Sequence, residues 1–389
     1  MRALLFERSL PRFAAARVAS SVAPGRGSRF GPLRLAQLDE PALPGPGWQR
    51  VRPRLAGICG SDLATVDGRS SRYFEPIVSF PFVPGHEVVG ELDDGSRVVL
   101  EPVLACAARG IDPPCDSCAA GTNGNCERIA FGHLEPGLQT GYCADTGGGW
   151  SEAFVAHQSQ LHTVPADMAD EDAVMVEPMA CAVHAVQSTE IGEGATVVVL
   201  GAGTLGLCTI AALRRLALPG VVIAGAKHPD QRRLATDLGA DVVVEPDQVQ
   251  RAVRRRTASL AVGRQLTGGA DIVVDCVGNQ ASLAEALSIV RPRGTIVLVG
   301  MPGPVLVDLA PLWQREVRLV GSYAYRHQTF PTAFEVVHAA ALGRLVSALY
   351  PLDRYREAID HAAHAGRRGA VKIAFDLRKE ARPEVRRMG

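Results

Sequence analysis

The chain has 389 residues, which is enough for two domains of ordinary size. Its 41 basic and 41 acidic residues cancel to a formal charge of zero, so a general attraction to nucleic acid or to an anionic membrane is not expected. No apolar run is long enough to cross a bilayer, and the amino terminus lacks the basic-then-apolar pattern of a signal peptide. We therefore expect a globular protein that resides in the cytoplasm.

The first 165 residues have the pattern of short β-strands separated by glycine and proline turns. From Thr196 the pattern changes to apolar, β-branched runs that alternate with helical stretches, of which the first extends from Leu205 to about Leu216. This alternation predicts a doubly wound parallel sheet. The predicted strands are Arg50–Leu55, Val88–Leu92, Ser96–Leu100, Thr196–Leu200, Val221–Ala224, Asp241–Val244, Asp271–Cys276 and Thr295–Gly300.

The alternation stops after about Ser322. Helices are predicted near Thr332–Leu342 and Arg354–Ala363, and a last strand at Ala370–Asp376. We expect this tail to pack back on the first domain.

Four cysteines, Cys106, Cys115, Cys118 and Cys126, lie close together in the sequence. Four thiolates can complete a tetrahedral zinc site that has no open position and therefore stabilises a loop without catalysing a reaction. The alternatives are two disulfides or four unrelated cysteines. In a reducing compartment, clustered cysteines favour metal over disulfides.

A glycine-rich turn, Gly201-Ala202-Gly203-Thr204-Leu205-Gly206, follows a predicted strand and precedes a predicted helix. In this context Gly201 and Gly203 allow a tight turn and close approach of the backbone to a pyrophosphate, which would lie at the helix amino terminus. Gly206 allows the helix to pack closely on the strand. The turn predicts a dinucleotide site; the alternative is a purely structural turn.

The end of the next strand discriminates between the two nicotinamide dinucleotides. NAD-binding proteins usually carry an acid there to bind the ribose 2′-hydroxyl. In this chain Ile223–His228 contains no acid, and Lys227 is followed by Arg232 and Arg233. Cations suit a 2′-phosphate, so the sequence favours NADP(H) over NAD(H), unless these are ordinary surface residues.

A second set of metal-binding residue types is dispersed along the chain. Taken alone, Cys59 could be a buried small hydrophobe and His86 a hydrogen-bonded core histidine. Together with Glu87 and Glu177 they form a mixed sulfur, nitrogen and oxygen set that suits an open zinc site. Glu177 lies in an apolar stretch, where a carboxylate is costly unless it is paired or bound to metal.

These features occur together in one order, and the chain resembles the zinc-dependent medium-chain dehydrogenase/reductase family, whose members include alcohol, sorbitol and threonine dehydrogenases. The resemblance implies an α/β protein with a GroES-like, β-rich catalytic domain at residues 1–185, a Rossmann domain at 186–322 and a return to the catalytic domain at 323–389. The cysteine lobe would occupy about residues 101–130. The motifs that carry the resemblance are Gly57–Asp62, Pro84–Glu87, the four cysteines, Glu177-Pro178, Gly201–Gly206 and Asp275–Gly278.

By this resemblance Cys59, His86 and Glu177 are catalytic zinc ligands, and Glu87 is a further ligand that exchanges with water. Ser61 would relay the proton of the substrate hydroxyl, and Asp62 would orient a ligand. Cys181 is a rival to Glu177; we favour Glu177 because the Glu-Pro pair matches the sorbitol and threonine branch. The implied cofactor-binding residues are Gly201, Gly203, Thr204, Leu205, Gly206, Gly225, Lys227, Arg232, Val277 and Gly300.

The resemblance thus predicts two zinc ions per chain, one catalytic and one structural, in a homodimer or homotetramer. The predicted activity is hydride transfer between NADP(H) and a secondary alcohol or polyol, or the corresponding ketone or aldehyde. The alternatives are a zinc-free quinone or enone reductase and a non-enzymatic NADPH-binding relative. No nucleic-acid or membrane partner is expected.

Three segments carry further expectations. Ala107–Pro114 is longer than the usual spacer of the cysteine lobe, but it leaves the other spacers intact, so we expect the site to form; Cys106 is the ligand that would be lost if it did not. Gly132–Trp150 is interpreted as a turn-rich surface loop, with pocket lining as the alternative. Tyr323, Tyr325 and His327 could line a cleft or belong to the core or the rim.

Overall fold

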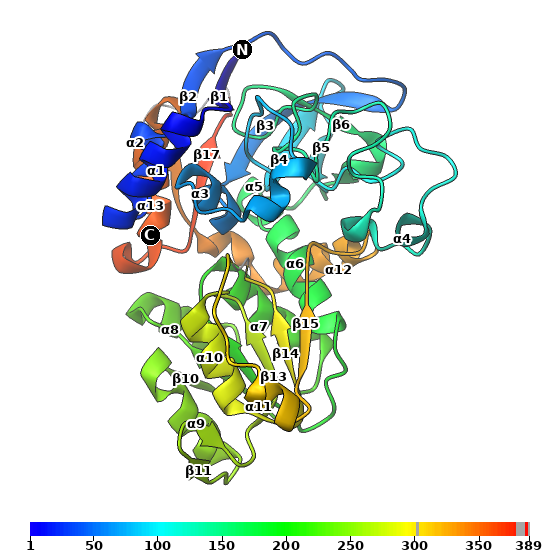
Figure 1. Cartoon of the computed structure of the whole chain (residues 1–389). Coiled ribbons are helices and arrows are strands. Elements are labelled where there is room, and N and C mark those ends of the chain that lie inside the picture. The colour runs from blue at the N-terminus through cyan, green and yellow to red at the C-terminus, as the bar shows by residue number, and fades with distance from the viewer. Residues whose placement is uncertain (301–302, 379–385, 388–389) are drawn as a thin grey trace. The chain divides into compact units, whose positions relative to one another are not determined.

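The computed structural model describes residues 1–300, 303–378 and 386–387. The chain divides into two compact units, one made of residues 1–177 and 326–389 and the other of residues 178–325 (Figure 1). The sequence places these boundaries at 185 and 322. The first boundary differs because helix α6 (Val176–Gln187) is continuous and belongs to the first unit only at its beginning.

An eight-stranded sheet forms the body of the first unit. Its order is β18-β16-β17-β3-β4-β5-β7, and β6 also pairs with β3. The predicted strands at 50–55, 88–92 and 96–100 are confirmed as β3, β4 and β5. The bounds are β3 Trp48–Gly57, β4 Val88–Leu92, β5 Arg97–Leu100, β6 Phe154–His157, β7 Leu161–Thr163, β16 Val346–Tyr350, β17 Lys372–Asp376 and β18 Arg386–Arg387.

The carboxy-terminal segment completes this sheet, as predicted. Strand β17 pairs antiparallel with β3, so that Ala374 lies opposite Gly57. The amide of Ile58 donates to the carbonyl of Ile373 at 2.9 Å. The backbone immediately before Cys59 is therefore held in place by the last strand of the sheet.

The prediction of strands alone in the first 165 residues is wrong. A separate antiparallel pair is formed by β1 (Arg2–Phe6) and β2 (Leu33–Gln37). Between these strands in the sequence are two helices, α1 (Leu10–Val22) and α2 (Gly27–Phe30). The α1 segment is rich in alanine and has its proline in the first turn, where proline is tolerated. The other helices of this unit are α3 Gly60–Val66, α4 Asp116–Ala119, α5 Asp170–Ala173, α12 Thr329–Ala340 and α13 Tyr355–Ala363.

Helix α2 packs beside α13, and α13 packs on α3 (Figure 1). Asp67, at the end of α3, is fully buried and accepts hydrogen bonds from the amides of Gly25 (2.9 Å) and Gly27 (3.1 Å). A side chain at Gly27 would meet the carbonyl oxygen of Val66 at 2.1 Å. The amino-terminal helices are thus fastened to the helix that follows Cys59.

The second unit contains a six-stranded parallel sheet in the order β10-β9-β8-β13-β14-β15. When the six strands are numbered along the chain, with β8 as strand 1 and β15 as strand 6, their order in the sheet is 3-2-1-4-5-6, which is that of a Rossmann fold. Strand β14 begins earlier than predicted and ends at Leu298, so Gly300 lies beyond the strand. The bounds are β8 Thr196–Leu200, β9 Val221–Gly225, β10 Val242–Val244, β13 Ala270–Asp275, β14 Val290–Leu298 and β15 Arg318–Gly321, with a small pair β11 Ala261–Val262 and β12 Gln265–Leu266.

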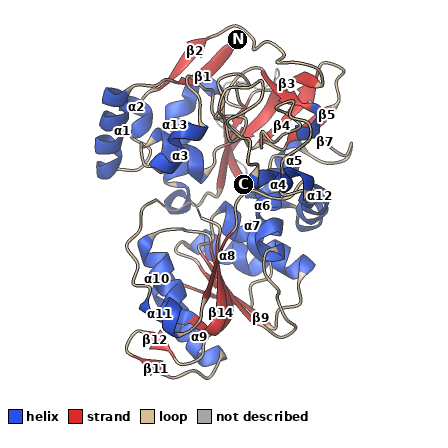
Figure 2. Ribbon diagram, turned by 45° about the vertical axis from the view of Figure 1, so that its right-hand side comes forward, coloured by secondary structure: helices blue, strands red, loops and turns tan. Residues whose placement is uncertain are grey.

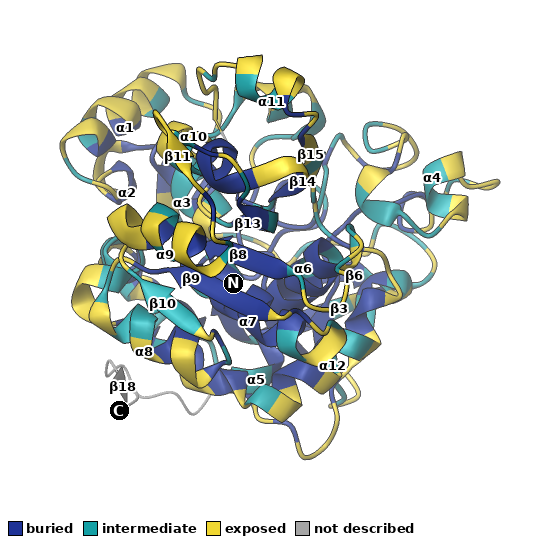
Figure 3. Ribbon diagram, turned by 90° about the horizontal axis from the view of Figure 1, so that it is seen from below, coloured by how far each residue is buried: buried dark blue, intermediate teal, exposed yellow. Residues whose placement is uncertain are grey.

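Helices cover both faces of this sheet (Figures 2 and 3). Helices α7 and α8 contact one another on one face, and α9 and α10 do so on the other. Strands β8 and β9 are buried throughout their length, which explains their uninterrupted apolar sequences. The helices are α7 Thr204–Leu216, α8 Pro229–Asp237, α9 Val249–Arg256, α10 Gln280–Ile289 and α11 Ala310–Gln314.

Candidate active site and metal centres

Cys59 caps the amino terminus of helix α3, which begins at Gly60. Its backbone amide donates to Asp62 Oδ2 at 3.0 Å, and its sulfur faces the amide of the same residue in a reciprocal cap. Asp62 is 1% exposed. The spacing between Cys59 and Asp62 is therefore a helix-start arrangement, and it fixes the position of the thiol.

His86 lies next to this helix start. It is buried, and its Nδ1 makes no hydrogen bond, although Asp62 Oδ1 lies 3.4 Å away. Its Nε2 lies 3.5 Å from Ser61 Oγ. Burial alone would lower the pKa of His86, but the neighbouring Asp62 and Cys59 raise it well above its ordinary value. A buried imidazole beside a thiol, with a carboxylate facing its Nδ1, fits a metal-ligand set.

Gly85 explains why glycine precedes this histidine. Its φ is +101°, a conformation that favours glycine, and an added Cβ would lie 2.5 Å from the Trp150 ring. Trp150 is fully buried and donates its indole N–H to the carbonyl of Gly57 at 3.2 Å. The two segments that carry Cys59 and His86 are therefore held together through one tryptophan.

Glu87 has a partner that the sequence analysis missed. Both of its carboxylate oxygens accept from Lys372 Nζ, at 2.8 and 2.5 Å, and both residues are buried. Burial would lower the pKa of Lys372, but Glu87 and Cys59 raise it. The role of Glu87 as an exchangeable zinc ligand stays a prediction; in the structure both of its oxygens bind the Lys372 ammonium group. A lone lysine in the apolar strand β17 was the available signal.

Glu177 occupies the first turn of α6 and is 7% exposed. The negative charges of Glu177 and Cys59 both raise the pKa of Lys372, so these groups share one electrostatic environment. The rival Cys181 follows one helical turn later and is partly buried. Within the described residues, two groups gather three or more ligand atoms within 4.8 Å, and the set of Cys59, His86 and Glu177 is not one of them.

Tyr142 adds a hydroxyl close to these residues. Its OH donates to Asp62 Oδ1 at 3.4 Å and lies 3.2 Å from Thr65 Oγ1. Burial, followed by the Asp62 charge, raises its pKa well above the ordinary value. The interpretation of Gly132–Trp150 as a surface loop is wrong for its later part, since residues 140–143 and 146–150 are buried.

The four lobe cysteines are brought together by the fold. All four are free thiols, and their sulfurs lie within 4.8 Å of one another. Cys106 Sγ is 3.7 Å from Cys126 Sγ, and Cys115 Sγ is 4.0 Å from Cys126 Sγ. A disulfide needs about 2.05 Å, whereas a tetrahedron with Zn–S bonds of about 2.3 Å has edges of about 3.8 Å. The spacing fits a zinc tetrahedron.

Backbone amides assist these thiols. The amide of Cys115 donates to Cys106 Sγ, and that of Arg128 donates to Cys126 Sγ, both at 3.4 Å. Burial would raise the pKa of Cys115, but the amides of Cys118 and Glu127 overcome it and hold that pKa at about 7. Burial raises the pKa of Cys126 to about 11 and also raises that of Cys118.

The long spacer Ala107–Pro114 does not displace Cys106, because Arg109 anchors it. Arg109 is fully buried, and its guanidinium donates to backbone carbonyls on both sides of the lobe. The acceptors are the carbonyls of Leu104, Phe131, Leu134, Glu135 and Gly137.

The glycine turn has the geometry that a dinucleotide site needs. Gly201 has a φ of +87°, and a side chain at Gly206 would lie 1.8 Å from the carbonyl oxygen of Gly201. Gly203 begins α7, and an added Cβ there would meet no atom within 4 Å. Two glycines are thus required for packing, while the third leaves space at the helix amino terminus, where a pyrophosphate would fit.

The residues proposed for the 2′-phosphate lie beyond β9. Gly225 ends the strand, Lys227 is exposed, and Arg232 donates to the carbonyls of residues 226 and 227. Arg232 also forms an ion pair of 3.2 Å with Glu245. Lys227 is an exposed cation at this position, and Arg233, whose side chain is also largely exposed, is paired with Asp237 at 3.2 Å.

Val277 and Gly300 adjoin the glycine turn. A Cβ on Gly201 would lie 2.5 Å from Val277 Cγ2, and one on Gly300 would meet the backbone of Val277 at 2.6 Å. Asp275 is buried and accepts from the amides of Val277 (2.9 Å) and Gly278 (3.1 Å). The Asp275–Gly278 motif thus shapes a second turn beside the first.

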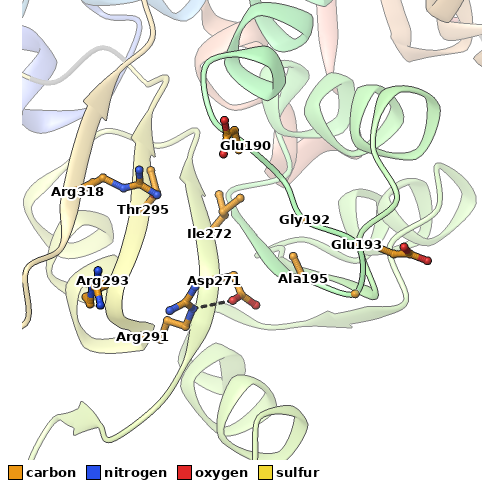
Figure 4. Close-up of a pocket in the computed structure, with 11 residues that line it drawn as sticks. Glu190, Gly192, Glu193, Ala195, Asp271, Ile272, Arg291, Arg293, Thr295 and Arg318 are labelled. Atoms are coloured by element: carbon orange, nitrogen blue, oxygen red, sulfur yellow. Dashed lines mark hydrogen bonds and ion pairs between the residues drawn. The ribbon is translucent and has the colours of Figure 1, made fainter.

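A cavity of about 250 Å³ lies at the opposite, amino-terminal edge of the parallel sheet (Figure 4). Asp271 pairs with Arg291 there, at 2.6 Å. Since the glycine turn follows the carboxyl end of β8, this cavity is not the dinucleotide site. Its charged lining is Glu190, Glu193, Asp271, Arg291, Arg293 and Arg318.

Two family patterns match this chain. The pattern of the alcohol dehydrogenase GroES-like domain matches residues 45–166, and that of the zinc-binding dehydrogenases matches residues 204–339. The first match lies within the first unit, and the second covers most of the Rossmann unit and continues to residue 339. The chain belongs to the zinc-dependent medium-chain dehydrogenase/reductase family, and it is an oxidoreductase of the alcohol dehydrogenase type.

The relatives agree with this assignment. Sorbitol dehydrogenase of Arabidopsis thaliana is 28% identical over 86% of this chain and 89% of its own, and L-idonate 5-dehydrogenase of Vitis vinifera is 28% identical over the same shares. A zinc-binding dehydrogenase from Sinorhizobium meliloti 1021, solved with NADP, is 26% identical with a TM-score of 0.70, covering 88% of this chain and 95% of that one. No helix in the described ranges is long and apolar enough to cross a membrane.

Proposed function

We propose that the protein interconverts a secondary hydroxyl group of a polyol and the corresponding carbonyl group, with one zinc ion at Cys59, His86 and Glu177 and with NADP(H) as the redox partner. The observation that carries this proposal is the buried His86 imidazole, which has Asp62 Oδ1 3.4 Å from its Nδ1 and interacts with the helix-start thiol of Cys59. The names of the relatives support a polyol as substrate. When bound, zinc would supply Lewis acidity at the substrate oxygen, and the nicotinamide would exchange the hydride.

The surrounding residues have separate tasks. Asp62 holds the Cys59 amide and faces His86 Nδ1, so it fixes the orientation of both side chains. Ser61, whose Oγ lies 3.5 Å from His86 Nε2, takes the proton of the substrate hydroxyl and passes it outward. Tyr142 donates to Asp62 and keeps that carboxylate in place.

Glu87 and Lys372 form an ion pair. The lysine thereby neutralises part of the negative charge that Glu87, Cys59 and Glu177 bring to this region. We propose Glu177, rather than Glu87, as the carboxylate that binds zinc, because the Glu87 oxygens are engaged by Lys372. The sulfur of Cys59, the imidazole of His86 and the carboxylate of Glu177 would then hold the ion. Three protein ligands leave one position for substrate, as in other catalytic zinc sites.

The four-cysteine lobe would hold the second zinc ion of each chain. Its support is the arrangement of sulfur atoms, which matches the edges of a zinc tetrahedron. A site with four protein ligands has no open position, so we assign it a structural role.

The preference for NADP(H) is supported by two observations. No acid ends β9, and the exposed Lys227 follows directly, in a position suited to a 2′-phosphate. The Sinorhizobium meliloti relative, with 26% identity, was solved with NADP. We also propose that the protein forms a homodimer or homotetramer in the cytoplasm, which light scattering and cell fractionation would test.

The function is tested by incubating the purified protein with polyols, simple secondary alcohols and quinones, each with NADP⁺ or NADPH, while NADPH absorbance is followed. We expect turnover of polyols that is abolished in Cys59→Ala and His86→Ala, although both variants fold. Undiminished activity in those variants would point to a zinc-free reductase. Binding of NADPH without any turnover would point to a non-enzymatic relative.

A further inference from the structure

A second group of ligand-type side chains lies in the first unit and shares no residue with the sites assigned above. Glu101 directly follows β5, His162 is the middle residue of β7, and His327 precedes α12. Strands β5 and β7 are paired, with Val99 opposite His162. The cluster therefore joins the edge of the sheet to the segment that returns from the Rossmann unit.

The three side chains meet at one oxygen atom. Glu101 Oε2 lies 2.8 Å from His162 Nε2 and 2.6 Å from His327 Nδ1. The three ligand atoms all lie within 4.8 Å of one another. An ion with bonds of about 2.0–2.1 Å to nitrogen and oxygen separates adjacent ligand atoms by about 2.9–3.4 Å, so a small outward shift of these groups would admit it.

The cluster is built on a rigid base. Glu101 is 2% exposed, its amide donates to the carbonyl of Gln160 at 2.7 Å, and its own carbonyl accepts from the Gln160 side chain at 3.2 Å. The His162 ring stacks on Phe330 with centroids 4.1 Å apart and an interplanar angle of 4°. A buried carboxylate and a stacked imidazole are thus held in fixed orientations, as metal ligands require.

One side of the cluster is open. The His327 side chain is 51% exposed, whereas that of His162 is 15% exposed. An ion could therefore enter from solvent beside His327 and keep water in its remaining positions. The ligand set excludes calcium and magnesium, which prefer oxygen ligands, and suits a borderline transition ion.

We propose that Glu101, His162 and His327 form a third divalent-metal site, which binds zinc-type ions through two imidazoles and one carboxylate. The site uses none of the residues of the two zinc sites expected from the family, and it contains no thiolate. Bound metal would tie the β5–β7 edge to the segment before α12, and so stabilise the first unit.

The test uses tag-free holoprotein that retains its two zinc ions, dialysed against a buffer of controlled free Zn²⁺ and analysed for metal content. We expect the wild type to bind one more equivalent than His327→Ala, and its melting temperature to rise with Zn²⁺ while that of the variant does not. Glu101→Gln should also lose this equivalent; if that buried change prevents folding, the half-exposed His327 still provides the test. The matched control is His338→Ala, an exposed histidine at the far end of α12.

Cobalt gives an independent readout. When Co²⁺ is added to the holoprotein, the third site should give weak d–d bands without the thiolate charge-transfer band of cysteine-bound cobalt. Equal metal binding in wild type and His327→Ala would overturn the proposal, and so would loss of the third equivalent in His338→Ala. The cluster would then be a hydrogen-bonded network alone.

Discussion

The cysteine lobe and the Cys59 site use similar ligands but are assembled in different ways. The lobe takes its four thiols from a short stretch, and their sulfurs already lie within 4.8 Å of one another. The Cys59 site takes its groups from α3, the turn before β4 and the start of α6, and each group is held by a different neighbour. A local site can be organised by its own loop, whereas a dispersed site depends on residues such as Asp62 and Lys372.

The sharpest test of the dispersed site compares two residues one helical turn apart. We expect Glu177→Ala to lower kcat/KM by about three orders of magnitude, or roughly 4 kcal/mol, because the site would lose a zinc ligand. Cys181→Ala should change kcat/KM by less than about threefold. Steady-state kinetics and the zinc content of both variants give the comparison. The reverse pattern would make Cys181 the ligand.

Lys372 tests whether the dispersed site needs its neighbours for stability. Lys372→Met leaves the Glu87 carboxylate buried without its partner, so we expect a loss of about 3–5 kcal/mol in the free energy of unfolding, measured with urea. The double variant Lys372→Met/Glu87→Gln should recover most of this loss, because no buried charge is left unpaired. Equal stability of wild type and single variant would show that the pair contributes little.

In the cysteine lobe, we expect loss of a ligand to lower stability and zinc content but to leave turnover nearly unchanged. Cys118→Ser removes one of its four ligands, so we expect loss of one zinc ion per chain and a lower melting temperature. At a temperature where the variant is still folded, kcat should stay within about threefold of wild type, since the site has no open position for substrate. Metal analysis, thermal unfolding and kinetics report these effects. Loss of kcat with full stability would contradict the structural role.

The smallest expected effect concerns the cofactor. Lys227→Asp places an acid after β9, where it would repel a 2′-phosphate and could bind a ribose hydroxyl. We expect the ratio of kcat/KM for NADP⁺ to that for NAD⁺ to fall about tenfold, or roughly 1.4 kcal/mol. Lys227→Gln is the neutral control and should give a smaller change. An unchanged ratio would remove Lys227 from the proposed site.

The sequence was sufficient where the signal is local. The β-branched run before Gly201 predicts β8, and the roles of Gly201 and Gly206 follow from contacts within the same turn. It was insufficient where one residue depends on a distant partner. Nothing near Glu87 indicates that Lys372 binds it, because that contact requires β17 to pair with β3.

Three other features were not predicted because they too depend on partners that are distant in the sequence. The α1 segment was missed because its alanine- and serine-rich sequence has no strong apolar period. Its position depends on a distant residue, since Ser20 Oγ donates to the carbonyl of Asp67. The cluster around Glu101 joins three separate segments, so no spacing in the sequence reveals it. Arg109 was likewise invisible, since its partners are backbone carbonyls across the lobe.

The catalytic zinc site is tested most directly by an anomalous difference map, recorded at the zinc edge from crystals of the protein. We expect one peak among the four lobe sulfurs and a second peak bonded to Cys59 Sγ, His86 and Glu177. The lobe peak serves as an internal control for the presence of zinc. A lobe peak without a peak at Cys59 and His86 in active crystals would contradict the proposed catalytic site.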